Sequence, residues 1–70
     1  MERLISEGFG CKIIERDSKL FIQYDNGQAA SWIVENEVTA DEAKKAMLSG
    51  NDAYEVILAA QKRGKARKVE

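Results

Sequence analysis

The chain contains no histidine and no proline, and Cys11 is its single cysteine. Histidine is the side chain whose ordinary pKa lies nearest to neutral pH, so its absence excludes the usual serine and cysteine catalytic triads. One cysteine cannot form an intrachain disulfide, and without histidine it has no partner for a common zinc site. The sequence therefore predicts a protein with no metal, no other cofactor and no enzymatic activity.

Long apolar runs are also missing. No run approaches the roughly 20 residues that a bilayer-spanning helix needs, and residues 1–7 are too short and too acidic for a signal peptide. Hydrophobic residues make up 44% of the chain and charged residues 33%, which is typical of a folded domain. We expect a cytoplasmic protein that forms one small domain over residues 1–70, with no membrane partner and no small-molecule substrate.

Strand-like patterns dominate the first half of the chain. Residues 11–16 and 20–24 are rich in strand-forming residues, and Asp17-Ser18 between them predicts a tight turn. Asn26-Gly27 is a strong signal for a two-residue hairpin turn, which places a third strand at residues 29–35. Residues 1–7 are compatible with either a short helix or a leading strand. The expectation is a three-stranded antiparallel β-meander.

Two-residue turns in both hairpins would fix which residues share each face of the sheet. One predicted face carries Cys11, Ile13, Leu20, Ile22, Tyr24, Ala29 and Ile33. The other predicted face carries Ile14, Phe21, Ala30, Trp32 and Val34, together with Lys12, Arg16, Lys19 and Gln23. In this register, Ile14 lies opposite Phe21 and Phe21 lies opposite Trp32.

Helix signals occupy the second half. Thr39-Ala40-Asp41-Glu42 has the form of a capping box, and the residues from 49 to 52 interrupt the helical pattern that follows. A second helix is predicted over residues 52–63, ending before Gly64, with residues 64–70 as a basic, frayed tail. The predicted fold class is α+β, a three-stranded antiparallel β-meander followed by two α-helices packed on one face.

Aromatic residues on the face that the helices leave open suggest a binding surface, because aromatic side chains are enriched at interfaces. The leading hypothesis is a non-enzymatic protein-binding module that forms a homodimer or acts as an adaptor or inhibitor of a larger protein. The row formed by Ile14, Phe21 and Trp32 instead belongs to the core if the register differs by one residue or the N-terminal segment covers it. The predicted contacts are the anchors Phe21 and Trp32, their neighbours Ile14 and Val34, and the basic rim Lys12, Arg16 and Lys19.

Charge is divided along the chain. Residues 1–61 hold eleven acids and six bases, whereas residues 62–70 hold five bases and one acid. This pattern fits either a solvated helix end that complements the helix dipole or a segment that contacts nucleic-acid phosphates. In the second case, Asp52 and Glu55 would oppose binding at the start of the same helix. The predicted nucleic-acid contacts are Lys62, Arg63, Lys65, Arg67 and Lys68.

Overall fold

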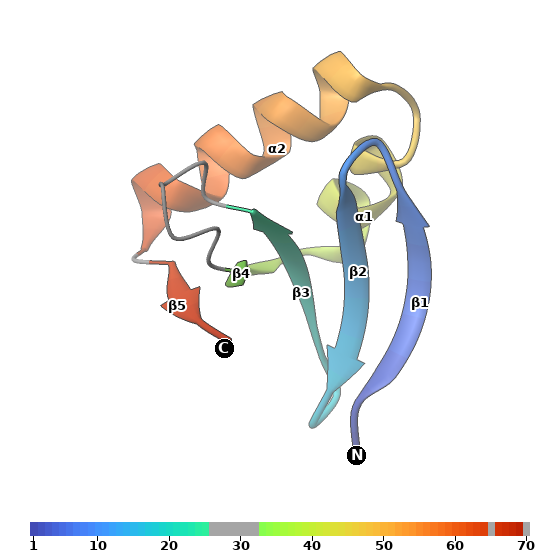
Figure 1. The fold of residues 1–70 in the computed structure, drawn as a ribbon, viewed down its shortest axis with the longest axis vertical. Coiled ribbons are helices and arrows are strands. Elements are labelled where there is room, and N and C mark those ends of the chain that lie inside the picture. The colour runs from blue at the N-terminus through green and yellow to red at the C-terminus, as the bar shows by residue number, and fades with distance from the viewer. Residues whose placement is uncertain (26–32, 65, 70) are drawn as a thin grey trace.

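The computed structural model describes residues 1–25, 33–64 and 66–69. Within them, five antiparallel strands form one sheet in the order of the sequence, and two helices complete an α+β fold (Figure 1). The fold class is confirmed, but the predicted number of strands is too low. The elements are β1 (Arg3–Gly8), β2 (Cys11–Arg16), β3 (Lys19–Asp25), β4 (Ile33–Val38), α1 (Ala40–Ala46), α2 (Gly50–Arg63) and β5 (Arg67–Lys68).

The N-terminal segment forms β1, an edge strand antiparallel to β2. Its register changes between Leu4, which pairs with Ile14, and Ser6, which pairs with Ile13. Ile5 is therefore the extra residue of a β-bulge. Phe9 and Gly10 connect the two strands with positive φ angles of 53° and 77°, the backbone that a tight hairpin turn requires.

The hairpin of β2 and β3 follows the prediction closely. Ile14 pairs with Phe21 and Cys11 pairs with Tyr24, as expected from a two-residue turn. Asp17 and Ser18 form that turn with φ angles of 54° and 63°. Local sequence therefore determines this register, because the turn and the strand pattern favour the same pairing.

The predicted register of the second hairpin is wrong. Tyr24 pairs with Val34, whereas a two-residue turn would have paired it with Ala29. This odd displacement exchanges the two faces of the strand, so Val34 lies on the helix-covered face. The displaced register buries Val34 and Val38 beneath the helices, and this apolar burial outweighs the local turn preference. The predicted turn at Asn26-Gly27 lies outside the described residues.

Both helices begin at side-chain caps. The Thr39 hydroxyl accepts a hydrogen bond from the Glu42 amide at 3.1 Å, and the Glu42 carboxylate accepts one from the Thr39 amide at 2.9 Å. This reciprocal pair confirms the predicted capping box. Ser49 caps α2, which starts two residues before the predicted position and ends at Arg63 as expected. Beyond it, β5 pairs with β4 where the sequence suggested a frayed tail.

The core lies between the sheet and the two helices, which cover the same face of the sheet (Figure 1). Ile13, Ile22 and Val56 are its most completely buried large side chains. The small residues Ala46, Ala53 and Ala60 let the helices approach the sheet closely. The full core is Cys11, Ile13, Ile22, Tyr24, Val34, Val38, Ala46, Ala53, Val56 and Ala60.

Within the part of the chain that the structure describes, neither helix has the length and apolar character needed to cross a membrane.

Candidate functional site

Arg16 contacts several residues on the sheet face opposite the helices. Its guanidinium carbon lies 4.5 Å from the centroid of the Phe21 ring, a cation–π arrangement. The guanidinium also forms ion pairs with Glu35 and, at 3.2 Å, with Glu2. The hydrogen bond to Glu35 is the main cause that raises the pKa of Arg16. Arg16 therefore connects the end of β2 to β4 and to the N-terminal segment.

Glu35 is a buried carboxylate, with only 2% of its surface exposed. It accepts hydrogen bonds from Arg16 and, at 3.1 Å, from the Gln23 side-chain amide. A buried carboxylate needs such partners because desolvation of the charge is costly. Among the described residues, no buried side-chain nitrogen or oxygen lacks a hydrogen-bond partner. The centre of this face is thus a closed polar network.

The predicted apolar row on this face is only partly formed. Ile14 is buried, and Phe21 is half-buried below Arg16. On β4, Phe21 pairs with Glu37 and not with Trp32, which lies outside the described residues. Val34 is buried on the opposite face. The rim residues Lys12 and Lys19 are exposed, as expected, and the binding role of the whole set stays a prediction.

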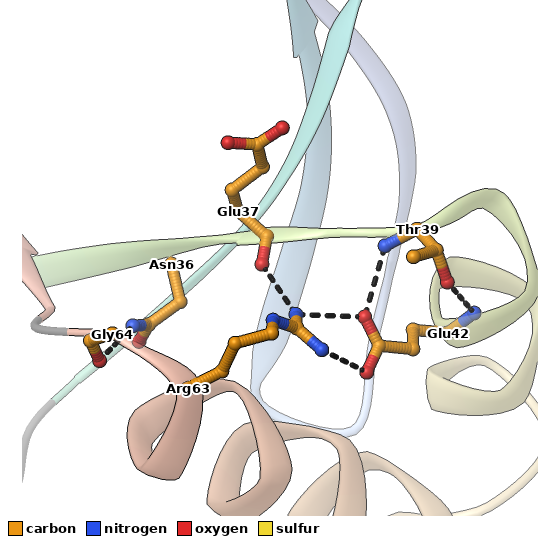
Figure 2. A network of polar contacts seen from close by, with 6 residues as sticks. All are labelled: Asn36, Glu37, Thr39, Glu42, Arg63 and Gly64. Atoms are coloured by element: carbon orange, nitrogen blue, oxygen red, sulfur yellow. Dashed lines mark hydrogen bonds and ion pairs between the residues drawn. The ribbon is translucent and has the colours of Figure 1, made fainter.

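Arg63 connects the end of α2 to the start of α1. Its two terminal nitrogens donate to the Glu42 carboxylate, both at 2.9 Å, and one also donates to the Glu37 carbonyl at 2.8 Å (Figure 2). The Arg63 hydrogen bonds are the main cause that lowers the pKa of Glu42, and they raise the pKa of Arg63. A cavity of about 540 Å³ lies beside these groups. The Arg63 guanidinium is therefore already engaged in hydrogen bonds with Glu42 and Glu37.

The other predicted nucleic-acid contacts do not lie together on one face of a single helix. Lys62 is exposed at the end of α2, whereas Arg67 and Lys68 are exposed in the edge strand β5. Arg67 pairs in register with the acidic residue Glu35. Lys65 lies outside the described residues. With Arg63 bound to Glu42, the nucleic-acid alternative gains no support from this arrangement and stays a prediction.

A chain of polar contacts, buried at Tyr24 and Asn36 and exposed at Gln61, connects α2 to the sheet. The Tyr24 hydroxyl donates to the Asn36 side-chain carbonyl at 2.6 Å and accepts from the Gln61 amide at 3.0 Å. Asn36 in turn donates to the Gly64 carbonyl at 3.3 Å (Figure 2). Sequence reasoning missed this chain because its members lie on three separate elements. One signal was available, the polar Asn36 between the apolar residues Val34 and Val38.

Cys11 lies beside a second cavity, of about 420 Å³. Its thiol donates to the Gly8 carbonyl at 3.3 Å, and burial raises the pKa of the thiol. A protonated thiol is a poor nucleophile and a poor metal ligand, so Cys11 acts as a small core residue. The described residues contain no group of three or more histidine, cysteine, aspartate or glutamate residues that could hold a metal ion.

A third cavity, of about 400 Å³, forms an apolar groove between β1 and α1. Ile5 forms one wall, Met47 and Leu48 form the other, and Ile13 and Leu20 contribute to the lining between them. Ile5 is 43% exposed and Leu48 is 72% exposed, so both walls present apolar surface to solvent. The sequence did not predict this groove, because one of its walls comes from residues 1–7, which the sequence pattern assigned to neither a helix nor a strand.

Phe9 extends the same apolar region. Its side chain is 55% exposed, and its ring lies 3.9 Å from the position that a Cβ atom on Gly50 would occupy. Gly50 follows Leu48 by two residues, so the hairpin tip reaches the start of α2 next to the groove. We call the groove together with Ile5, Phe9 and Leu48 the β1–α1 surface. Leu48 is the most exposed of these three side chains.

Comparison of the chain with protein-family models, with curated proteins and with solved structures finds no match.

Proposed function

We propose that the chain is a small protein-binding module that docks a partner through the β1–α1 surface. The observation that carries this proposal is the exposure of Ile5, Phe9 and Leu48, at 43%, 55% and 72%, around an apolar groove. Contiguous exposed apolar surface is uncommon on folded monomers and usually marks an interaction site. Burying such side chains in an interface is the main source of binding free energy.

This surface is a better candidate than the sheet face centred on Phe21. Ile14 is buried there, and Arg16 already covers one side of the Phe21 ring. A partner on that face would also have to approach the Arg16–Glu35 network without leaving a buried charge unpaired. The β1–α1 surface imposes no such cost, because the one charged residue that lines its groove, Lys44, is exposed and is not part of a buried ion pair. The role of Phe21 and Trp32 as anchors of a binding face stays a prediction.

The proposal is tested by affinity purification from the source cells with three forms of the chain. Leu48→Asp places a charge in the groove wall, and Leu58→Asp is the matched control because Leu58 is an exposed leucine of α2 that does not line the groove. Proteins retained by the wild type and by Leu58→Asp, but lost with Leu48→Asp, are the expected result. Identical retention by all three forms would contradict the proposal.

A further inference from the structure

The outer edge of β1 has no partner strand among the described residues. The sheet order runs from β1 to β5, and β1 forms one margin of the sheet (Figure 1). No backbone–backbone hydrogen bond of a turn, loop or cap between described residues uses β1 either, and the one side-chain contact with its backbone is that of the Cys11 thiol with the Gly8 carbonyl. An exposed strand edge offers a row of amide and carbonyl groups that can pair with another extended segment.

The β-bulge directs side chains from this edge into the groove. Leu4 and Ser6 pair with neighbouring residues of β2, so Ile5 is the additional residue between them. As a result, the consecutive residues Ile5 and Ser6 both line the groove. A strand added to β1 would place every second side chain on the helix side of the sheet, next to Met47 and Leu48. Those side chains should be apolar.

Lys44 adds a charge preference. It lines the groove, and its side-chain ammonium makes no ion pair or hydrogen bond with the described residues. The adjacent Lys45, in contrast, contacts Asp52 at 3.3 Å and Glu55 at 3.0 Å. A carboxylate on the incoming strand would give the Lys44 ammonium the partner that it lacks.

A second copy of the chain fits this edge poorly. Two β1 strands paired antiparallel about a two-fold axis keep their helix sides together. The helix side of β1 carries Arg3, because its partner Glu15 pairs in turn with Leu20 in the groove. Ile5 and Ser6 are the other helix-side residues of β1 near the groove. The Arg3 guanidinium is already paired with Glu15 of its own chain at 2.6 Å, so such a dimer would bring no acidic side chain of β1 towards Lys44.

We infer that β1 accepts an extended segment of another protein by β-strand addition. The inference rests on the proposed function and specifies the conformation and the side chains of the partner segment that binds. The segment pairs with the outer edge of β1, its alternate apolar side chains enter the groove, and one acidic side chain on the same side meets Lys44. Affinity comes from backbone hydrogen bonds and apolar burial, whereas the acid provides selectivity.

The test selects ligands for the full chain from a random library of ten-residue peptides displayed on phage. Enriched peptides should alternate apolar residues with one acid on the apolar side. Methylation of the backbone nitrogens that face β1 should weaken binding of a selected synthetic peptide by at least about tenfold, because it removes hydrogen bonds. Methylation of the intervening nitrogens is the matched control. Binding should also slow amide hydrogen exchange in β1.

Charge reversal tests the role of Lys44. Lys44→Glu should weaken binding of the acidic peptide by about tenfold and favour a peptide in which lysine replaces the acid, whereas Lys62→Glu, at an exposed lysine near the end of α2 that does not line the groove, should leave the affinity unchanged. Three results would overturn strand addition. They are the absence of enriched peptides, a selected peptide that is indifferent to backbone methylation, and a stable dimer of the chain with β1 at its interface. Methylation-indifferent peptides that Leu48→Asp still abolishes would leave the proposed function standing.

Discussion

Arg16 at the end of β2 and Glu35 in β4 form an ion pair across the uncovered face of the sheet, although β3 lies between their strands. The Arg16 side chain spans this distance by lying against the Phe21 ring. Three consecutive strands are thereby connected by one side chain. Sequence reasoning assigned Arg16 to the rim of an interface, whereas its contacts are internal.

Removal of Arg16 should destabilise the fold. Arg16→Ala leaves the buried Glu35 carboxylate with Gln23 as its remaining side-chain donor, and an unpaired buried charge is strongly unfavourable. We expect the midpoint of thermal unfolding, followed by circular dichroism, to fall by more than about 5 °C. Lys19→Ala is the control and should leave the midpoint unchanged. Equal midpoints for the two variants would show that the ion pair contributes nothing to stability.

A second test removes both charges of the Arg16–Glu35 ion pair instead of one. In the double variant Arg16→Met with Glu35→Leu, both charges are absent, so no buried group is left without a partner. Replacing a buried ion pair with apolar residues is often neutral or stabilising. We expect the double variant to recover most of the unfolding midpoint that Arg16→Ala loses. A double variant as unstable as Arg16→Ala would mean that Arg16 stabilises the fold mainly by its contact with Phe21.

The Arg63–Glu42 contact should make stability depend on pH. The pKa of Glu42 is lowered in the folded protein, so its contribution is fully present above its ordinary pKa of 4.5 and is lost as pH falls through the lower folded value. In urea unfolding, wild type should therefore lose more free energy of unfolding than Glu42→Gln when pH is lowered below 4.5. Asp41→Asn, in the same helical turn, should retain the wild-type pH dependence. Parallel wild-type and Glu42→Gln curves would contradict this assignment.

The N-cap of α1 gives a more local prediction. Thr39→Ala removes the hydroxyl that accepts from the Glu42 amide, and loss of such a cap costs about 1 kcal/mol in the free energy of unfolding. Thr39→Ser retains an acceptor oxygen and should remain close to wild type. Urea unfolding at neutral pH measures both. A Thr39→Ser variant as destabilised as Thr39→Ala would point to the lost methyl group instead of the hydrogen bond.

The hydrogen bonds of Tyr24 to Asn36 and Gln61 should hold α2 in place. Tyr24→Phe leaves the buried Asn36 carbonyl without that partner, which costs about 1–3 kcal/mol, whereas the exposed Gln61 amide can bond to water instead. Amide hydrogen exchange should rise at the end of α2. Tyr54→Phe is the control, because Tyr54 is exposed on the same helix. Unchanged exchange in Tyr24→Phe would contradict a positioning role for this chain of contacts.

Features encoded by neighbouring residues were predictable from the sequence. The Asp17-Ser18 turn set the β2–β3 register, and the Thr39 to Glu42 capping box set the start of α1. The β4 register was not predictable in the same way. Burial of Val34 and Val38 against helices far along the chain decides it, and the Asn26-Gly27 signal pointed to another pairing.

The candidate site was less predictable than the fold. The β1–α1 surface combines Ile5 with Leu48. Ile5 lies in an N-terminal segment whose sequence is compatible with either a helix or a strand, and Leu48 is the second residue after α1. Neither residue belongs to a motif, and their proximity arises from tertiary packing alone. The predicted site relied on the register expected from a two-residue turn at Asn26-Gly27, so an error in that register removed Val34 from it and paired Phe21 with Glu37.

Site-specific photo-crosslinking in the source cells would show where on the chain a partner docks. A photoreactive amino acid is placed at Leu48, at Leu58 or at Phe21, and the adducts are resolved by mass. We expect a discrete protein adduct from the probe at Leu48 and none from the probe at Leu58. Adducts from the probe at Phe21 alone, or equal adducts from all three positions, would contradict a partner site at the β1–α1 surface.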